Sequence, residues 1–449
     1  MTLHDRRSDD PLPHSSRNLS RRRLLQATGL GALAFSASPL LAACGDSSAG
    51  SSGGTTTLKL MSWEQFEPRE KAAWYKVIND FQTANPSIKV QWTGWPFSTY
   101  DQNVVAQAQA GSIDADVVMC PPELASALID KYKMTVSLQS IVDDLKLDPA
   151  PAQNQFKVGT DLHGLTVIDV PFALTYDQRL LQAGGFKKPP ATLSEWMSQA
   201  AALTHRPKQF GIALFNSVAS GADWWNQLQN FPLGFGGVWA SGKTLKLDSA
   251  PVIKSMEYWL EMLNAAGPKG SAEAEVNQLY DEDRIVMSLQ VAAGINGYAK
   301  TAPKLYPNLR STAPPWPGNK AIARLHPVVV MKNSNNQQAA MELVKFILTP
   351  KNLYYVSKAN GYPIIPYTNF SELLPAYKQY HKNTPWISGF LDTNYVGESE
   401  ILGSYTPLYA EIGQIIIKAM ADAVSGNGSV KRVMTQAQQQ ATRQLSSQI

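Results

Sequence analysis

The sequence predicts an α/β protein whose sheets consist mostly of parallel strands with helices on both faces. The first observation is that short, continuously apolar segments alternate with amphipathic segments between residues 58 and 132. Continuously apolar strands are typical of sheets buried on both faces, and the amphipathic crossovers supply the covering helices. The second observation is that Trp or carboxylate residues directly follow three of these strands. Because ligands of parallel sheets bind at the carboxyl ends of the strands, we expect one shared rim there.

Each element is predicted by its periodicity and by the residues that end it. The first half is expected to contain strand 58–63, helix 70–84, strand 85–95, helix 100–110, strand 111–120 and helix 124–132. The later chain is expected to contain strands at 165–176, 284–294 and 323–331, and helices at 193–203, 224–229, 250–264 and 336–348. Pro171 interrupts the strand that spans 165–176. A Pro at this point suits a hinge, although Pro in a strand can also mark a sheet edge.

The length and charge of the chain limit the classes of function. The 449 residues suffice for two or three domains. Six Arg and three Asp precede Cys44, and the rest of the chain holds 34 basic and 33 acidic residues. This part of the chain is nearly neutral and lacks the excess of positive charge that is typical of nucleic-acid-binding proteins.

Residues 1–43 have the composition of an export signal. A basic stretch, an apolar run from Leu24 and a small-residue boundary at Leu41-Ala-Ala-Cys44 follow one another, and this order is typical of a signal peptide. The paired Arg before a weakly apolar run resembles a twin-arginine signal, with general export as the alternative. An uncleaved membrane anchor is the other interpretation, but the run is rich in Gly, Ser and Ala rather than Leu and Ile.

The Leu-Ala-Ala-Cys box resembles the bacterial lipoprotein cleavage site, which predicts a lipidated Cys44 at the new N-terminus. Acyl chains would hold the protein at the outer face of the cell membrane or on its periplasmic side, contributing about 0.8 kcal/mol per CH₂. Residues 44–57 form a Ser-, Gly- and Thr-rich tether in this interpretation, or a merely disordered terminus in the alternative one. Cys120 is the only other cysteine, so neither an intramolecular disulfide nor a cysteine-based zinc site is expected.

Several blocks of the mature chain stand in a recognisable order. They are FQTANPSIKVQW, AGSIDADVVMCPPELASAL, LHGLTVIDVPFALTYDQRLLQAGGFKKPPATLSEW, RIVMSLQVAAG, PPWPG and VVVMKNSNNQQAAMELVKFILTP. Over residues 58–370 this layout resembles the extracellular solute-binding proteins of ABC importers, in particular the family 1, sugar-binding type. The chain departs from the family pattern at Asp177, at VAAGINGY, where a stacking Trp is missing, and at Leu325-His326-Pro327. These departures fall near the expected cleft and concern the identity of the ligand.

The resemblance implies a two-lobed, type II periplasmic-binding-protein-like fold, with crossover strands as the hinge. Lobe one would comprise 58–168 and 295–345, and lobe two 172–292 and 350–449. A mono- or oligosaccharide would bind between the lobes, hinge closure would bury it, and permease subunits of an importer would receive it. We expect a monomer without cofactor or metal.

Sugars present apolar faces to aromatic rings and paired hydroxyls to carboxylates, amides and Arg. Trp at strand ends or in loops are therefore binding candidates, with packing over the core as the alternative. Polar candidates follow strands or stand at the departures from the family pattern, and helix capping or ion pairing is their alternative role. The predicted ligand-binding residues are Trp63, Glu64, Trp95, Glu123, Tyr176, Asp177, Trp224, Trp225, Trp239, Asn296, Tyr298, Trp316 and Arg324.

Catalysis finds little support in the sequence. No nucleophile elbow, His-Glu-x-x-His pair or Gly-Lys-Thr phosphate loop is present. The alternative of a secreted glycoside hydrolase remains open, because hydrolases also use Trp platforms and carboxylates. A further alternative keeps the binding fold but changes the solute to a glycerophosphodiester, a polyol, a polyamine or another polar molecule.

Overall fold

The structure is a computed structural model that describes residues 55–67, 70–359, 361–362 and 364–449. The predicted signal peptide, Cys44 and the tether up to residue 54 lie outside the described residues.

The first half of the described chain alternates strands and helices as the sequence predicts. The elements are β1 (Thr56–Met61), α1 (Lys71–Ala84), β2 (Ile88–Thr93), α2 (Phe97–Gln109), β3 (Val117–Met119) and α3 (Pro122–Ser126). Strand β1 pairs in parallel with both β2 and β3. The amphipathic crossovers therefore return each strand in the same direction, which confirms the α/β class.

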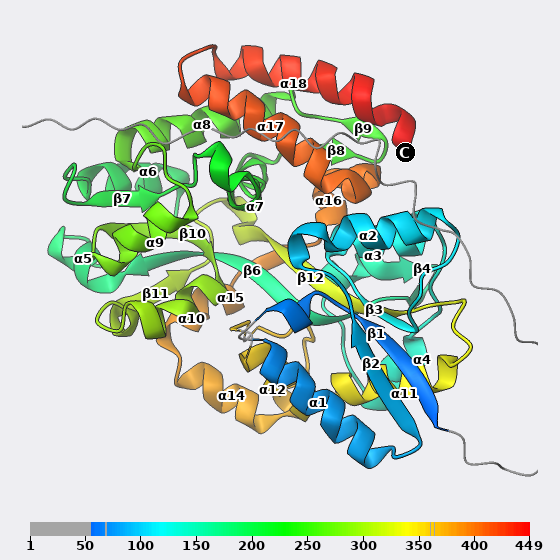
Figure 1. Cartoon of the computed structure of the whole chain (residues 1–449). Helices are drawn as coiled ribbons and strands as arrows, with labels where there is room; N and C mark the ends of the chain where they lie inside the picture. The colour runs from blue at the N-terminus through cyan, green and yellow to red at the C-terminus, as the bar shows by residue number, and fades with distance from the viewer. Residues whose placement is uncertain (1–54, 68–69, 360, 363) are drawn as a thin grey trace, which may run out of the picture. The chain divides into compact units, whose positions relative to one another are not determined.

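Two long strands, β6 (Leu165–Asp177) and β12 (Lys320–Val330), run antiparallel to each other through the centre of the molecule (Figure 1). They sit in a nine-stranded sheet. Seven of its strands follow the order β2-β1-β3-β12-β6-β10-β7, where β10 is Ile285–Val291 and β7 is Phe210–Ala213. The other two are β11 (Leu309–Thr312), which pairs with β6, and β13 (Asn394–Val396), which pairs with β12. Strand β6 continues through Pro171, whose Cα partner is Ala323. The register shifts between His326 and Pro327, because a proline has no amide hydrogen for the ladder. All four antiparallel pairings of this sheet involve β6 or β12.

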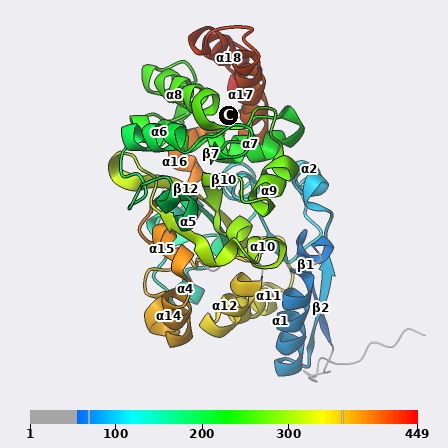
Figure 2. The same cartoon turned by 90° about the vertical axis from the view of Figure 1, so that its left-hand side faces the viewer.

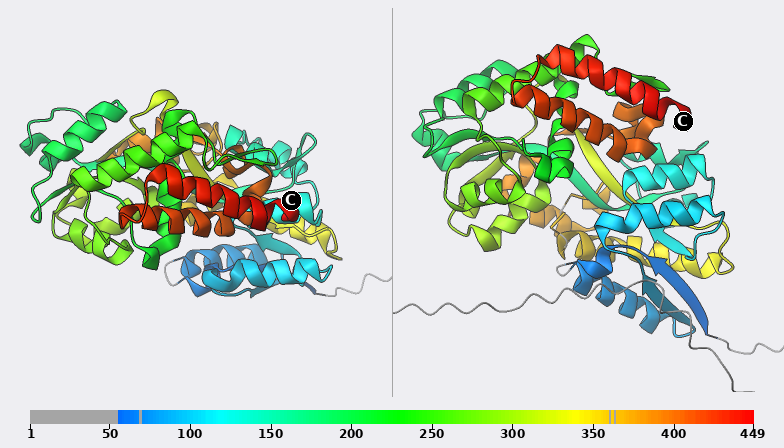
Figure 3. Two further views of the ribbon diagram at one scale, coloured as in Figure 1. Left: turned by 90° about the horizontal axis from the view of Figure 1, so that it is seen from above. Right: turned by 45° about the horizontal axis from the view of Figure 1, so that its top comes forward.

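The remaining elements flank these two strands. The strands are β4 (Lys157–Val158), β5 (Asp161–Leu162), β7 (Phe210–Ala213), β8 (Ala240–Ser241), β9 (Thr244–Leu245), β10 (Ile285–Val291), β11 (Leu309–Thr312) and β13 (Asn394–Val396). The helices are α4 (Gln139–Leu145), α5 (Gln178–Ala183), α6 (Leu193–Ala202), α7 (Gly221–Leu228), α8 (Ala250–Ala266), α9 (Glu273–Asp281), α10 (Ala292–Thr301), α11 (Gln337–Leu348), α12 (Pro350–Ala359), α13 (Phe370–Leu373), α14 (Pro375–Lys382), α15 (Ser388–Leu391), α16 (Glu398–Leu402), α17 (Tyr409–Val424) and α18 (Val430–Leu445). Figures 2 and 3 show α17 and α18 lying side by side, and α8 also contacts α18.

The buried apolar residues form separate cores that meet at the crossing strands. One core contains β1–β3 and the helices around them, and it reaches β6 as far as Ile168. A second core takes over at Phe172 on β6 and a third at Ala173, the next residue. Because successive residues of a strand point to opposite faces, the second and third cores cover the two faces of the sheet around β6, β7 and β10. We call the elements around the first core lobe one and those around the other two cores lobe two.

The cores divide the chain differently from the predicted lobe boundaries in two segments. Residues 295–322 were expected in lobe one, but their buried side chains, such as Ile295 and Trp316, pack in the cores of lobe two. Residues 353–377 were expected in lobe two, but Leu353 and Phe370 pack in the core of lobe one. Helix α10 starts directly after β10, so the chain does not pass into lobe one at this point. Helix α12 packs on α1 and α11, which brings residues 353–377 into lobe one.

Candidate functional site

A cavity of about 1300 Å³ is lined by elements of both lobes and by both crossing strands. It exceeds the roughly 300–1,000 Å³ of a typical small-molecule site. Lobe one contributes the start of α2, α3 and Tyr362, and lobe two contributes α7, α9, α10 and α17. On β12, Arg324 and His326 are two positions apart, so both side chains face the cavity. The site is therefore a groove between two packed bodies, crossed by the strands that join them.

Arg324 lies at the centre of a buried ion network. Its Nη2 atom donates to both carboxylate oxygens of Glu123, at 3.1 and 3.0 Å, and its Nη1 atom donates to Glu398 Oε1. The guanidinium also lies 4.2 Å from the ring centroid of Tyr409, a cation–π geometry. Glu123 belongs to α3 of lobe one and Glu398 to α16 of lobe two. This network therefore connects the two lobes through the crossing strand.

A third carboxylate, Asp101 on α2, also faces this network. Burial first, and then the charge of Glu123, raises the pKa of Asp101 to about 8. Burial also raises the pKa of Glu398 to about 8, although Arg324 acts in the opposite direction. Three carboxylates thus surround a single guanidinium, and protons compensate the excess negative charge near neutral pH.

Several buried polar atoms of the cavity wall have no partner among the described residues. They are Asp101 Oδ1, Trp225 Nε1, Gln290 Oε1 and both ring nitrogens of His326. His326 is 8% exposed, and burial together with the charge of Arg324 lowers the pKa of His326 to about 3. The imidazole is therefore neutral and offers one acceptor and one donor. Buried polar atoms without partners are costly, so they mark positions that a hydrogen-bonding solute would satisfy.

Aromatic side chains from both lobes complete the wall. They are Phe97, Phe172, Phe215, Trp225, Tyr298, Tyr362 and Tyr409. Trp225 packs against Trp239 at 5.2 Å and against Tyr409 at 5.6 Å between ring centroids. Gly413 on α17 admits this ring, since a Cβ at position 413 would lie 2.6 Å from Trp225 Cδ1. The cavity therefore combines ring faces with carboxylate, amide and imidazole groups.

Four of the predicted site residues line this cavity: Glu123, Trp225, Tyr298 and Arg324. Tyr298 lies on α10, where its hydroxyl accepts from Gln290 Nε2 at 3.2 Å and donates to Asn277 Oδ1 at 3.1 Å. These contacts fix the position of the ring at the cavity wall.

Trp63, Glu64 and Trp95 lie in lobe one and do not line the cavity. Trp63 is 4% exposed and makes edge contacts with Phe97 and His326, both at 5.4 Å. It therefore supports two residues that do line the cavity. Glu64 is buried, and burial raises the pKa of its carboxyl group to about 8. Trp95 is half-buried against the core of lobe one.

Trp224, Trp239 and Trp316 pack in the second core and do not line the cavity. Trp224 stacks on Trp259 at 5.5 Å. The indole of Trp239 donates to Gln229 O at 3.1 Å, and that of Trp316 donates to Lys320 O at 2.7 Å. These contacts correct the interpretation of all three as loop aromatics, since each ring packs in the core.

Tyr176, Asp177 and Asn296 also lie outside the cavity lining. Asp177 accepts from the backbone amides of Arg179 and Leu180 and so caps α5, which was its alternative role. Tyr176 is half-buried on β6, and Asn296 is half-buried on α10.

The sequence analysis missed several residues of the site, notably Asp101, Gln290, Glu398 and Tyr409. Asp101 and Tyr409 lie in helical segments far from any strand end, so the rule that selects strand ends does not reach them. Gln290 lies within the predicted strand 284–294 and is the last residue but one of β10. The rule that selects residues near strand ends could therefore have included it.

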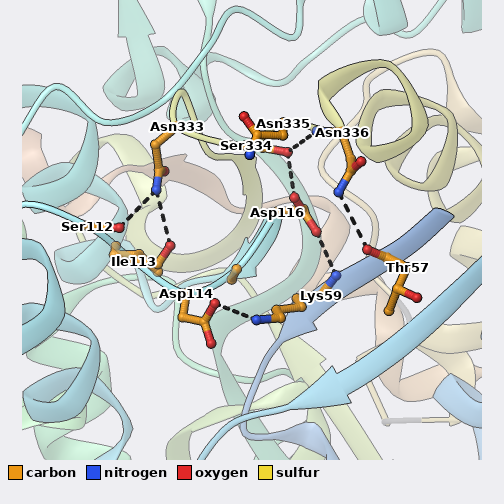
Figure 4. A pocket seen from close by; sticks show the side chains of 11 residues that line it. Thr57, Lys59, Ser112, Ile113, Asp114, Asp116, Asn333, Ser334, Asn335 and Asn336 are labelled. Atoms are coloured by element: carbon orange, nitrogen blue, oxygen red, sulfur yellow. Dashed lines mark hydrogen bonds and ion pairs between the residues drawn. The ribbon is translucent and has the colours of Figure 1, made fainter. Parts of the chain in front are cut away.

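A second, smaller hollow of about 400 Å³ lies at the amino end of β1 (Figure 4). Its polar side chains bond to one another: Lys59 Nζ lies 2.5 Å from Asp114 Oδ1, and Ser334 Oγ donates to Asp116 Oδ1 at 2.5 Å. It also lies at the end of the strand opposite to the one where parallel sheets bind ligands. We therefore do not assign it a ligand.

Two absences concern only the part of the chain that the structure describes. None of its helices is both long enough and apolar enough to span a bilayer. Its His, Cys, Asp and Glu side chains form no group of three or more that could hold a metal ion.

The comparison with protein families identifies the class of this chain. Residues 76–385 match the family described as "Bacterial extracellular solute-binding protein". Because the match spans more than half of the sequence, the chain belongs to this family. No curated protein matches the chain.

Solved structures of similar fold cover nearly the whole described chain. The sugar-binding protein MalE from Xanthomonas citri is similar with a TM-score of 0.74 and 18% identity, covering 88% of this chain and 98% of that one. The GacH receptor of Streptomyces glaucescens, solved unliganded and with acarbose, gives 0.70 and 16%, covering 87% and 98%. UgpB from Mycobacterium tuberculosis, in complex with glycerophosphocholine, gives 0.70 and 15%, covering 88% and 100%. At these identities the likeness concerns the fold, and it confirms the two-lobed binding-protein architecture.

Proposed function

We propose that this protein is the substrate-binding component of an ABC importer and that it captures a carbohydrate or a carbohydrate-like polar solute. One observation carries the proposal: a cavity of about 1300 Å³ between two lobes combines aromatic faces with buried polar atoms that have no partner among the described residues. Rings suit the apolar faces of sugars, and the unpartnered atoms suit their hydroxyls. MalE and GacH, which share the fold, are a sugar-binding protein and a receptor solved with acarbose.

The proposal includes a cycle of capture and release without chemistry. Hinge motion about β6 and β12 would close the lobes on the solute, and membrane permease subunits would receive it. The protein would act as a monomer and would need no cofactor. A glycoside hydrolase is less consistent with the site, because Glu123 is held by a bidentate contact with Arg324 and so is poorly placed to act as acid or nucleophile.

A thermal-shift screen of sugars, polyols and oligosaccharides tests the binding function. A solute at about 100 times its dissociation constant adds about 2.7 kcal/mol to the free energy of unfolding, so the unfolding midpoint should rise for a limited set of solutes. Incubation of each solute that binds with excess protein should return it unchanged. Steady turnover of an oligosaccharide would contradict the proposal and would favour the hydrolase.

We also propose that the mature protein is tethered to the outer face of the cell membrane through Cys44, after removal of a twin-arginine-type signal. The Cys44→Ser variant should appear in the soluble fraction of cell extracts while keeping its solute affinity. Washed membranes that retained the variant as well as the wild-type protein would exclude lipid attachment at this position.

A further inference from the structure

The cavity contains more carboxylates than cationic groups. Its described lining residues include five acidic side chains and two basic ones, namely Asp101, Glu123, Asp223, Asp281 and Asp422 against Arg324 and Lys418. Neutral sugars need hydrogen-bonding carboxylates, but they do not need an excess of negative charge. The excess of carboxylates therefore favours a solute that carries a positive charge.

The charge of the Arg324 guanidinium is already matched by two carboxylates. Its Nη2 atom donates to both carboxylate oxygens of Glu123 and its Nη1 atom donates to Glu398, and its face lies over Tyr409 at 4.2 Å. A phosphate or carboxylate that approached it would also meet the charge of Glu123. The site is thus poorly suited to a phosphodiester, although UgpB binds one within the same fold.

Asp101 is the group that lacks a counter-charge. Its Oδ1 atom is buried and has no partner among the described residues. Its carboxyl group interacts electrostatically with Glu123 and Arg324, and also with Cys120 and Tyr100, both of which are buried. Of these neighbours only Arg324 is cationic, and it is shared with two other carboxylates. A positively charged group in the cavity next to Asp101 would balance the cluster.

The other unpartnered polar atoms of the cavity wall indicate which hydrogen-bonding groups the solute carries. Within the described part of the chain, the Oε1 atom of Gln290, which is 9% exposed, accepts no hydrogen bond, and the two ring nitrogens of His326, which is 8% exposed, have no partner. Trp225 Nε1 likewise has no acceptor among the described residues. Both donors and acceptors are therefore available, as hydroxyl groups require.

We propose that the solute is a polyhydroxylated molecule with a protonated amine, such as an amino sugar or amino polyol, and that Asp101 binds its ammonium group. This inference rests on the proposed solute-binding function and specifies its substrate class. Aromatic faces such as that of Trp225 add to the attraction of a cation. A proton occupies Asp101 in the empty site, as its pKa near 8 indicates, and the ammonium group displaces that proton.

The test uses pairs of solutes that differ by one amine. Titration calorimetry of the purified protein compares sorbitol with glucamine, and glucose with glucosamine. We expect at least one amine to bind about tenfold or more tightly than its hydroxyl partner, since a compensated buried carboxylate is worth that much or more. Asp101→Asn should remove this preference, so that the ratio of the amine affinity to the affinity of its neutral partner falls to about one within the variant. Asp114→Asn, an exposed aspartate outside this cavity, is the matched control and should keep the preference.

A second measurement avoids dependence on the folding of the variant. At pH 7, glucamine should release protons on binding to the wild-type protein, whereas sorbitol should release none, and calorimetry in two buffers of different ionisation enthalpy reports the difference. Equal or tighter binding of the neutral partners would overturn this inference and leave the proposed function intact. Tight binding of spermidine without binding of the amino polyols would overturn the part of the proposal that requires hydroxyl groups on the solute. Binding of no solute in either arm, together with no response to any solute in the thermal-shift screen, would overturn the proposed function as well.

Discussion

Glu64 shows how burial alone changes the chemistry of a side chain. It lies three residues after the end of β1, in the short helical turn Glu64–Phe66, and is 3% exposed. Burial first, and then the charges of Glu70 and Glu67, raises the pKa of Glu64 from 4.5 to about 8. At neutral pH its carboxyl group is therefore mostly protonated, which suits a structural role outside the cavity lining.

Glu64→Gln should stabilise the protein increasingly as the pH rises. A carboxyl group whose folded pKa lies above its unfolded value binds more protons in the folded state, so its contribution to stability falls as pH increases between the two values. Here the window runs from 4.5 to about 8, with a slope of up to about 1.4 kcal/mol per pH unit. Glutamine has the shape of the protonated acid and does not titrate. Urea unfolding of both proteins at pH 5 and pH 8 measures the difference.

The matched control is Glu257→Gln on the exposed side of α8. This change should leave the free energy of unfolding within a few tenths of a kcal/mol of wild type at both pH values. If Glu64→Gln shifted stability by the same amount at pH 5 and pH 8, Glu64 would titrate normally.

Position in the sheet brought two of the candidate residues to the cavity wall. Glu123 and Arg324 were selected because one follows β3 and the other stands on a buried strand, and both line the cavity; their role in solute binding stays a prediction. Trp224, Trp239 and Trp316 pack in the second core instead, since an indole fills a core as readily as it lines a cleft. Sequence alone does not say which side of a helix or loop a large ring will face.

At the scale of the element, α17 shapes the cavity through a glycine. Gly413 lies in the helix interior, where glycine costs about 1 kcal/mol relative to alanine. A Cβ there would meet three atoms of the Trp225 indole at 2.6–2.9 Å. The absence of a side chain thus lets α7 and α17 approach closely, with the Trp225 ring between them.

Gly413→Ala should therefore displace Trp225, weaken solute binding about tenfold and fail to gain the helix-propensity benefit. Gly297→Ala on α10 is the comparison for stability only, because a Cβ at position 297 meets nothing within 4 Å but the residue lines the cavity. That change should raise the unfolding midpoint or leave it unchanged. Calorimetric titration of wild type and Gly413→Ala with a solute found in the screen measures the binding effect, and thermal unfolding compares the two variants. Unchanged affinity of Gly413→Ala and equal unfolding midpoints of the two variants would show that the close contact at Trp225 does not matter.

At the scale of the whole molecule, the order of elements and the α/β class were predictable from periodicity, but the boundaries of the lobes were not. Residues 353–377 contain no signal that they turn back into lobe one, because an amphipathic helix such as α12 can pack on any apolar surface of suitable shape. Likewise, Glu398 lies 74 residues after Arg324 in the chain, and only the tertiary structure brings them together.

The Arg324 network makes the lobes and the crossing strand energetically dependent on one another. Arg324→Met would leave Glu123, Glu398 and Asp101 buried with no cation among them, and removal of one partner of a buried ion pair costs about 3–5 kcal/mol. The loss should be larger at pH 8 than at pH 5, because protonation of the carboxylates relieves their repulsion and is favoured when their folded pKa values are raised. Urea unfolding at the two pH values measures it.

The double variant Arg324→Met/Glu398→Gln should recover part of the stability, since it removes one of the stranded charges. The single variant should also loosen the relation between the lobes, because Glu123 on α3 and Glu398 on α16 no longer share a cation. Small-angle X-ray scattering without solute should then give a larger radius of gyration for Arg324→Met than for wild type. A loss of stability that is the same at both pH values, with unchanged scattering, would mean that Arg324 acts through packing on Tyr409 rather than by joining the two lobes.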